Sequence, residues 1–310
     1  MKNKNIDVII IGGGPAGMSA ALVLGRSRID SLILNTENPR NLVTTHSHGF
    51  LTQDGVHPSD IFSIAKKQLE KYPSVVYRKE KALQVVKTPK GFKVITDSKE
   101  YESERLILAT GHKDNVDQLG INGLEEVYGK SVYPCPFCDG FEMADRKLGV
   151  FGNAFSAPHF AKVIAHWSKD LIVFTNGEPL EEKRLITNLQ LNGIEVIDKP
   201  IKELVSINGQ LKEVVFQDGT SVEREGGFLS DTKSTASVDF AEKFEIPTVE
   251  GHFGLTFYEV DDNKETNVKG LYIIGDSRTG WSGIVGAAAE GSEVGAAITH
   301  QIIDERWKNH

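Results

Sequence analysis

Two copies of one short pattern, 140 residues apart, constrain the fold of this chain more than any other feature. Each copy consists of an apolar run, a glycine, a helix-like segment and a second apolar run. The first copy comprises residues 7–11, Gly12, 15–25 and 31–34, and the second comprises 148–151, Gly152, 156–167 and 171–174. Short continuous apolar runs are typical of buried parallel strands, and an intervening helix completes a βαβ unit. The sequence therefore predicts an α/β chain with two similar mononucleotide-binding halves.

Further strands are indicated on both sides of the second copy. Residues 105–111 form an apolar run that ends in Ala-Thr-Gly, and residues 270–276 form another that ends in Gly-Asp. A small-residue helix is expected at 286–298. Alternating apolar and polar residues at 80–101 and 203–222 predict antiparallel strands. The predicted fold class is α/β, with two Rossmann-like, three-layer nucleotide-binding domains.

Length and charge exclude several classes of protein. A chain of 310 residues suggests about two domains, and its net charge of −8 argues against a nucleic-acid partner. No run reaches the roughly 18 apolar residues that a membrane span needs, and the N-terminus has no signal-peptide pattern. We therefore expect a cytoplasmic protein without a membrane partner. The two cysteines, Cys135 and Cys138, are too few for a secreted disulfide scaffold.

The first glycine turn has the pattern of a dinucleotide-binding site. Gly12, Gly14 and Gly17 follow a predicted strand and open a predicted helix, with Pro15 and Ala16 between them. The first glycine permits the tight turn, the second permits backbone approach to a pyrophosphate, and the third permits close helix packing. The acidic residue expected after the second strand is replaced by Asn35, whose amide can still bind a ribose hydroxyl.

Cys135, Cys138 and Asp139 form the second chemical motif. Two thiols at this spacing can close a redox-active disulfide, and the adjacent carboxyl can move a proton to or from a thiol. The alternative is half of a zinc site, which needs two more ligands. The sequence has no second Cys-x-x-Cys and its nine histidines are scattered, so we expect no metal.

These motifs, in this order and spacing, resemble those of the low-molecular-weight thioredoxin reductase family of flavoproteins. The matching segments are 11–17, 109–111, 135–140 and 275–276. The resemblance implies an FAD domain at 1–114 and 244–310, split around an NAD(P)H-binding-like domain at 115–243 that carries the cysteine pair. It also implies that Cys138 faces the flavin, that Cys135 exchanges with an external disulfide, and that Asp139 is the acid/base. Family members are typically homodimers.

The resemblance also implies a set of FAD-binding residues beyond the first turn. Asp276 is expected near the ribityl-phosphate region, and His48 lies in a loop expected to pass near the flavin. The full expected set is Gly12, Gly14, Pro15, Ala16, Gly17, Asn35, Arg40, Asn41, His48, Ala109, Thr110, Gly111, Gly275, Asp276 and Ile284.

The second glycine turn departs from the family pattern. Ala154 replaces the glycine that permits approach to a pyrophosphate, and His159 stands where the family commonly has Glu. The family's His-Arg-Arg cluster for the 2′-phosphate of NADPH is replaced by the uncharged residues 175–177. Binding of NAD(P)H is therefore doubtful, because a phosphate without Arg or Lys loses a strong charge-assisted pair.

The resulting prediction is an FAD-dependent thiol–disulfide oxidoreductase without a standard NADPH site. Its substrate is a dithiol or disulfide, either a thioredoxin-like protein or a small molecule. Three alternatives stay open: an oxygen-dependent dithiol oxidase, a ferredoxin-dependent reductase, and a non-enzymatic flavoprotein scaffold. The residues between the cysteines and the Ser282–Gly283 pair before the last helix favour the oxidase branch, whereas Asp139 matches the reductases.

Overall fold

The computed structural model describes residues 6–250 and 256–308, and the chain divides into two compact units. The first unit comprises Met1–Arg40, Ser59–Lys113 and Thr235–His310. The second unit comprises Asn41–Pro58 and Asp114–Ser234. The segment 41–58 therefore groups with the second unit, although it is flanked in the sequence by the first.

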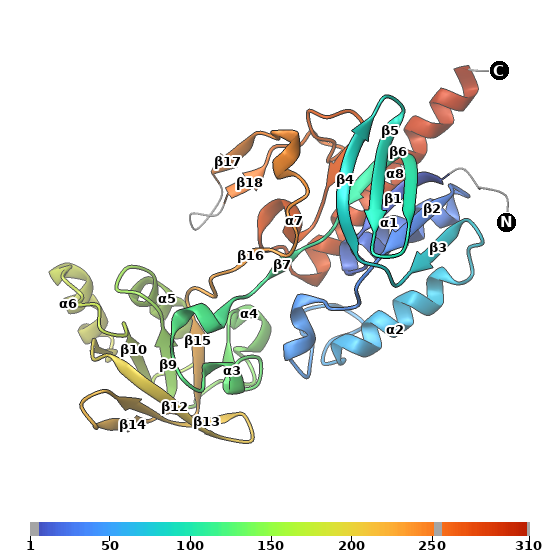
Figure 1. The fold of residues 1–310 in the computed structure, drawn as a ribbon. Helices are drawn as coiled ribbons and strands as arrows, with labels where there is room; N and C mark the ends of the chain where they lie inside the picture. The colour runs from blue at the N-terminus through green and yellow to red at the C-terminus, as the bar shows by residue number, and fades with distance from the viewer. Residues whose placement is uncertain (1–5, 251–255, 309–310) are drawn as a thin grey trace. The chain divides into compact units, whose positions relative to one another are not determined.

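A seven-stranded sheet forms the centre of the first unit (Figure 1). Its order is β3-β2-β1-β6-β5-β4, and β19 pairs with β6. The strands are β1 (Ile6–Ile11), β2 (Ser31–Leu34), β3 (Val75–Arg78), β4 (Ala82–Thr88), β5 (Gly91–Thr96), β6 (Glu100–Leu108) and β19 (Leu271–Ile273). The helices are α1 (Pro15–Arg26), α2 (Pro58–Leu69), α7 (Asp276–Thr279) and α8 (Gly283–Lys308). Short pairs are β7 (His112–Lys113) with β16 (Thr235–Ala236), and β17 (Thr248–Glu250) with β18 (Thr256–Tyr258).

The strand β6 has two kinds of neighbour. Its first half pairs antiparallel with β5, and its last three residues pair parallel with β19. The parallel part is the predicted strand at 105–108, and the antiparallel part extends the hairpin predicted at 80–101. The carboxyl ends of β1, β2, β6 and β19 consequently lie at one edge of the sheet.

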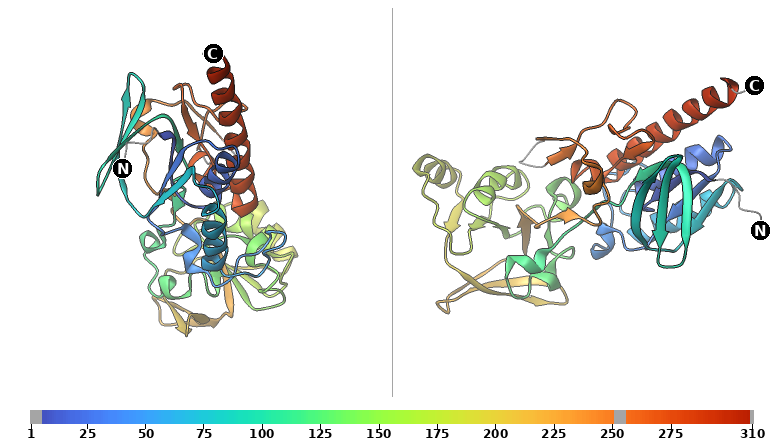
Figure 2. Two further views of the ribbon diagram at one scale, coloured as in Figure 1. Left: turned by 90° about the vertical axis from the view of Figure 1, so that its right-hand side faces the viewer. Right: turned by 45° about the horizontal axis from the view of Figure 1, so that its top comes forward.

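Small residues let α8 pack closely on α1. A Cβ at Gly291 would lie 2.0 Å from the backbone oxygen of Ala16, and a Cβ at Gly295 would lie 2.8 Å from the Cβ of Val23. The helix is longer than the predicted 286–298, because helix-forming polar residues continue it to Lys308. Figure 2 shows this helix running to the C-terminus.

The second unit is built on a five-stranded parallel sheet of order β11-β10-β9-β15-β8. The strands are β8 (Val132–Tyr133), β9 (Leu148–Phe151), β10 (Leu171–Phe174), β11 (Glu195–Ile197) and β15 (Gly226–Leu229). A three-stranded antiparallel sheet consists of β12 (Ile201–Ile207), β13 (Gln210–Phe216) and β14 (Ser221–Glu223). The helices are α3 (Leu124–Val127), α4 (Pro136–Asp139), α5 (Ser156–Ile164) and α6 (Lys183–Leu191). Three 3-10 turns are η1 (Arg40–Val43), η2 (Val116–Leu119) and, in the first unit, η3 (Glu242–Phe244).

The two predicted βαβ units are present, and the ends of their paired strands correspond at an offset of 140 residues. In the first, Ile11 pairs with Leu34, and in the second, Phe151 pairs with Phe174, 140 residues later. Apolar clusters cover both faces of each parallel sheet. The α/β fold with two Rossmann-like units is thereby confirmed. Within the described residues, no helix has the length and apolar character to cross a membrane.

Candidate active site

The first glycine turn, between β1 and α1, is shaped for close approach of a ligand. Gly12 has a φ of +111°, and a Cβ there would lie 2.0 Å from the backbone oxygen of Ala109. A Cβ at Gly17 would lie 2.0 Å from the oxygen of Gly12. Gly14, the N-cap residue of α1, has no side-chain cap and nothing within 4 Å of its Cβ position. The turn therefore leaves open space in front of the helix N-terminus, where phosphates bind.

A second turn, between β19 and α7, meets the start of α1. A Cβ at Gly275 would lie 3.0 Å from the Cβ of Ala16. Asp276 accepts hydrogen bonds at 2.7 Å from the backbone N–H and the hydroxyl of Ser282. Its other carboxylate oxygen forms an ion pair at 3.1 Å with Arg40. These contacts fix a carboxylate and a guanidinium beside the glycine turn.

The loop after β6 completes this edge of the sheet. The hydroxyl of Ser277 accepts a hydrogen bond at 2.6 Å from the N–H of Gly111 and lies 3.2 Å from the hydroxyl of Thr110. The guanidinium of Arg40 lies 4.4 Å from the centre of the Trp281 ring. The open turn, its glycines and the adjacent cation fit a dinucleotide cofactor such as FAD.

The structure brings most of the predicted cofactor residues together at the carboxyl edge of the first sheet. This group is Gly12, Gly14, Pro15, Ala16, Gly17, Asn35, Arg40, Ala109, Thr110, Gly111, Gly275, Asp276 and Ile284. Asn41 and His48 fall instead in the second unit. Contact of any of these residues with FAD stays a prediction.

Asn35 and Glu37, which follow the end of β2, have different hydrogen-bond and ion-pair partners. The amide of Asn35 donates to the hydroxyl of Tyr77 at 2.9 Å, and no described residue donates to its side-chain oxygen. Glu37 forms ion pairs at 2.9 Å with both Lys66 and Lys79. Hydrogen bonds from Lys79 and Lys66 lower the pKa of Glu37 to about 2. The carboxylate of Glu37 is therefore occupied by ion pairs within the protein. The side-chain oxygen of Asn35 can still accept a hydrogen bond from a ribose hydroxyl.

At the second glycine turn, between β9 and α5, side-chain oxygens of the protein accept hydrogen bonds from the backbone N–H groups. The side-chain oxygen of Asn153 accepts hydrogen bonds from the N–H groups of Phe155 (3.0 Å) and Ser156 (2.7 Å). The carboxylate of Glu178 accepts from the N–H of Ala154 at 2.9 Å. The N–H groups that would face a pyrophosphate at this turn already have partners.

The segment after β10 carries no cation for a phosphate. The hydroxyl of Thr175 donates to the backbone oxygen of Glu178 at 2.5 Å. The side chain of Asn176 accepts from the N–H of Ile201 at 2.8 Å. Residues 175–177 therefore serve the local fold and offer no positive charge to a phosphate.

Cys135 and Cys138 form a disulfide at the short helix α4. Their Cα atoms are 5.3 Å apart, within the usual range for a disulfide. Pro136 occupies the first turn of α4, where its missing N–H removes no hydrogen bond. Cys135 is buried, and Phe137 between the cysteines is 79% exposed, with its ring edge on Trp167. The disulfide therefore lies in a short helix that buries Cys135 and exposes the ring of Phe137.

Asp139, the last residue of α4, is a largely buried carboxyl. No described residue donates a hydrogen bond to its side chain. Burial raises the pKa of Asp139 to about 7, with His48 lowering it and Glu142 raising it further. The raised pKa of Tyr133, about 12, has the same principal cause, with Asp139 adding to it. Near neutral pH Asp139 can therefore either hold or release a proton, as an acid/base beside thiols must.

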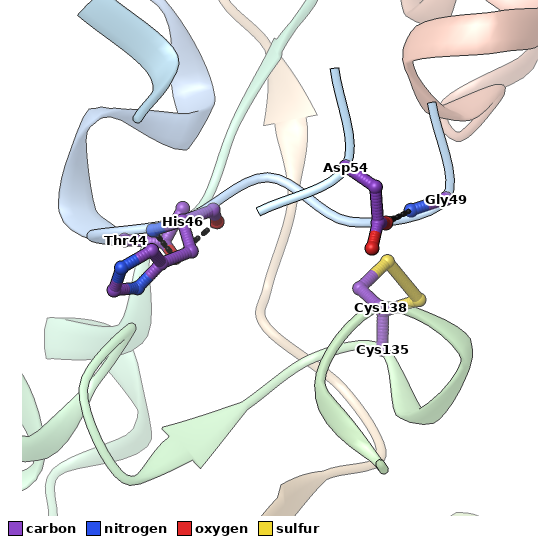
Figure 3. The surroundings of a disulfide bond; sticks show 6 residues. All are labelled: Thr44, His46, Gly49, Asp54, Cys135 and Cys138. Carbon is purple, nitrogen blue, oxygen red and sulfur yellow. Dashed lines mark hydrogen bonds between the residues drawn. A yellow bond between two sulfur atoms is a disulfide. The ribbon is translucent and has the colours of Figure 1, made fainter. Parts of the chain in front are cut away.

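The segment 41–58 carries His48 next to α4. The Nε2 atom of His48 lies 3.5 Å from Oε1 of Glu142, and its Nδ1 atom lies 3.6 Å from Oδ1 of Asp54. The same Asp54 oxygen accepts from the N–H of Gly49 at 2.8 Å. Figure 3 shows this segment with the disulfide, including the hydrogen bonds within residues 44–46 and from Gly49 to Asp54.

Sequence reasoning missed four residues that shape these sites: Asn153, Glu178, Asp54 and Glu142. Asn153 had a usable signal, because an Asn in a strand-to-helix turn often accepts hydrogen bonds from the N–H groups two and three residues later. The other three act across loops, and their partners are 5 to 94 residues away in the sequence. Within the described residues, no group of three His, Cys, Asp or Glu side chains is arranged to hold a metal ion.

Comparisons with known proteins identify the family of this chain. The family model described as pyridine nucleotide-disulphide oxidoreductase matches residues 6–291. The thioredoxin reductase aclD of Aspergillus oryzae is 28% identical, covering 97% of this chain and 98% of its own length. The thioredoxin reductase of Bacillus subtilis is also 28% identical, covering 97% and 96%.

A solved structure is closer still. The Bacillus anthracis protein assigned as the thioredoxin reductase TrxB is 35% identical and superimposes with a TM-score of 0.90, covering 97% of this chain and 99% of its own. The range matched by the family model, residues 6–291, includes both glycine turns and the cysteine pair. The chain therefore belongs to the pyridine nucleotide-disulphide oxidoreductase family, as a thioredoxin reductase-like, FAD-dependent oxidoreductase that acts on a sulfur group.

Proposed function

We propose that this enzyme exchanges electrons between FAD in its first domain and an external dithiol or disulfide through Cys135 and Cys138, without a pyridine nucleotide at the second turn. The observation that carries the proposal is the disulfide followed by the largely buried carboxyl of Asp139. The proposed FAD domain comprises 1–114 and 244–310, and the domain at 115–243 carries the cysteines. The compact unit that contains the first glycine turn supports this division, except that residues 41–58 group with the second unit and residues 235–243 with the first.

In the reducing direction, the thiolate of Cys135 attacks one sulfur of the external disulfide, forms a mixed disulfide with it and expels the other substrate sulfur as a thiolate. The thiolate of Cys138 then attacks the sulfur of Cys135, and the second substrate thiol leaves. Asp139 supplies the proton that a departing thiolate needs, and recovers it from water. FAD, when bound, gives or takes the electron pair that restores the cysteine pair. In the oxidising direction the same exchange steps run in reverse.

The cysteine pair can be tested without knowledge of the natural partner. Cys138→Ser is expected to retain FAD and to lose reduction of its flavin by dithiothreitol, whereas the wild-type flavin is bleached. Flavin absorbance under nitrogen reports both properties. A variant that kept full dithiol turnover would contradict the assignment and favour the non-enzymatic scaffold.

The partner class follows from the relatives and from the surface. The curated relatives are named thioredoxin reductases, which supports a thioredoxin-like disulfide partner. A small-molecule dithiol is the other candidate, because the disulfide lies beside the exposed ring of Phe137. We also propose a cytoplasmic homodimer, to be tested by light scattering at several protein concentrations.

An oxygen-dependent dithiol oxidase is the second candidate function. It is favoured by the hydrogen bonds of Glu178 and Asn153, which fill the second turn. Bleaching by a dithiol, reversed by air with formation of peroxide, would support it. A ferredoxin-dependent reductase would instead show flavin reduction by reduced ferredoxin and slow reoxidation in air.

A further inference from the structure

We propose that Tyr77 and Glu37 are positioning residues that hold the side-chain amide of Asn35 in one orientation. In that orientation the amide nitrogen is bonded within the protein, and the amide oxygen is left to accept a hydrogen bond from a ribose hydroxyl of the cofactor. The inference rests on the proposed FAD site at the first turn and does not involve the cysteines. Neither residue belongs to the expected set of FAD-binding residues.

An asparagine after β2 creates a problem of orientation that a carboxylate would not. Nucleotide-binding units of this kind commonly carry Asp or Glu here, and either carboxylate oxygen can accept from a ribose hydroxyl. An amide has one accepting end and one donating end. Rotation of the Asn35 amide by half a turn would present a donor, and the proton of the ribose hydroxyl would lose its partner. The neighbours of Asn35 must therefore select one of the two orientations.

The backbone and the side chain of Asn35 are both held beside the first turn. Its N–H donates to the backbone oxygen of Arg78 at 3.1 Å, which continues the parallel pairing of β2 with β3. A Cβ at Gly13 would lie 2.5 Å from Nδ2 and 2.7 Å from Cγ of Asn35. The amide therefore packs against the middle glycine of the turn that we propose binds the cofactor.

Two hydrogen bonds in series fix which end of the amide faces the protein. Nδ2 of Asn35 donates to the hydroxyl of Tyr77 at 2.9 Å, and that hydroxyl donates to Oε1 of Glu37 at 3.0 Å. Hydrogen bonds from Lys79 and Lys66 lower the pKa of Glu37 to about 2, so its carboxylate can only accept. Burial raises the pKa of Tyr77 to about 12, so its phenol keeps its single proton. That proton goes to Glu37, and the phenol oxygen must accept from the amide nitrogen.

The far end of this series is anchored by two cations. The Nζ atoms of Lys66, in α2, and Lys79, which follows β3, each lie 2.9 Å from a carboxylate oxygen of Glu37. Lys66 also lies 4.4 Å from the centre of the Tyr77 ring, a cation–π contact that holds the phenol in place. The amide nitrogen of Asn35 consequently has a fixed partner. No described residue donates to its oxygen, which is the atom that stays open to a ligand.

The test compares the loss of the Tyr77 hydroxyl in two backgrounds. A carboxylate has two equivalent accepting oxygens, so the variant Asn35→Asp presents an acceptor without being oriented. Tyr77→Phe should raise the Kd for FAD by about threefold in the natural protein, and by less than about 1.5-fold in the Asn35→Asp background. A role of Tyr77 in packing alone predicts the same ratio of Kd values in both backgrounds.

The Kd is measured by flavin fluorescence on serial dilution of each holoenzyme. Tyr101→Phe is the matched control, because it removes a phenol that donates to Glu80 at 2.9 Å elsewhere in the first unit. It should leave the Kd unchanged in both backgrounds.

Urea denaturation tests the direction of the hydrogen bonds without reference to FAD affinity. In Asn35→Asp, two carboxylates compete for the single proton of Tyr77. Adding Glu37→Gln lets the new amide donate to Tyr77, whose proton can then go to the carboxylate at position 35. Glu37→Gln should therefore lower the urea midpoint of the natural protein, and should lower it less, or raise it, in the Asn35→Asp background.

Equal Kd ratios in the two backgrounds, no change of Kd in either, or equal shifts of the urea midpoint would each overturn the inference. If Asn35→Asp does not retain FAD, the urea midpoints still decide it. Neither measurement uses the thiols. Failure of Cys135 and Cys138 to exchange with a disulfide would therefore overturn the proposed function and leave these results standing.

Discussion

The two glycine turns of this chain follow equivalent strands but differ in backbone conformation and in hydrogen bonding. The N–H of Gly12 donates to Leu34 at 2.9 Å, and that of Gly152 donates to Phe174 at 3.2 Å, at equivalent positions. Beyond that point, the first turn presents the uncapped start of α1. In the second turn, Asn153 and Glu178 accept hydrogen bonds from the backbone N–H groups of Ser156 and Ala154, at and just before the start of α5. A Rossmann-like strand–turn–helix unit is therefore not by itself evidence of a bound nucleotide. A few side chains decide whether the backbone N–H groups of the turn are available to a phosphate.

The two units also differ in the functional groups that they carry. The first unit keeps the open turn and its cation, Arg40. The second unit keeps the parallel sheet but uses its surface for Cys135, Cys138 and the acid Asp139. In the proposed division of labour, the nucleotide site and the thiol chemistry lie in different units.

The largest expected effect comes from matched substitutions at the first glycine of each turn. Gly12→Ala places a Cβ 2.0 Å from a backbone oxygen at a φ of +111°, and should lower the free energy of unfolding by about 3 kcal/mol or more. Gly152→Ala meets no backbone atom at close range but only side-chain atoms, the hydroxyl of Ser230 first and then the Cβ of Ala157 and the hydroxyl of Ser156 at 3.2 Å, and should lower it by about 1 kcal/mol. Urea denaturation of the two flavin-free variants measures both. Equal losses of unfolding free energy would mean that the two turns tolerate a Cβ at this glycine equally well.

Asp139→Asn tests whether the second unit retains acid/base chemistry. We expect thiol–disulfide exchange with dithiothreitol to slow by about 100-fold below pH 7, because the amide cannot supply a proton. The ratio of wild-type to variant rates should fall as the pH rises through about 7, since the acid form of Asp139 is then lost. Stopped-flow measurements give this ratio directly. A ratio independent of pH would contradict the role of Asp139.

Substitutions at the second glycine position separate folding from binding. Gly14→Ala places a methyl group in open space at an ordinary φ of −77°, so the stability of the flavin-free protein should change by less than about 0.5 kcal/mol. Its affinity for FAD should fall about tenfold or more, because the methyl group obstructs the pyrophosphate. Ala154→Gly, the matched change in the second turn, should leave FAD affinity unchanged. Flavin fluorescence measures both affinities.

Asn35→Ala should have the smallest effect. It removes the hydrogen bond to Tyr77 and the proposed ribose acceptor, which corresponds to about 1 kcal/mol of binding free energy, or about a fivefold weaker Kd for FAD. Tyr77→Phe removes the same hydrogen bond, together with the one that Tyr77 donates to Glu37 at 3.0 Å, and leaves the side-chain oxygen of Asn35 in place. An unchanged affinity in Asn35→Ala would show that the ribose is not bound there.

Sequence reasoning located both turns because their apolar runs and glycines are local patterns. It predicted the strands at 7–11 and 148–151 and the cysteine motif for the same reason. It did not predict that Glu178 fills the second turn or that His48 meets Glu142, because these contacts join loops that only the folded chain brings together. It also placed the end of the last helix too early, since the polar residues after 298 do not follow the small-residue pattern.

The central claim is that the first turn binds FAD while the second binds no pyridine nucleotide. Its most direct test is to record the flavin absorbance of the purified holoenzyme under nitrogen while adding NADPH, then NADH, then dithiothreitol. The account predicts no bleaching by either nucleotide up to millimolar concentration and full bleaching by the dithiol. Rapid bleaching by a nucleotide at micromolar concentration would contradict it, and would mean that the hydrogen bonds of Asn153 and Glu178 yield to a phosphate.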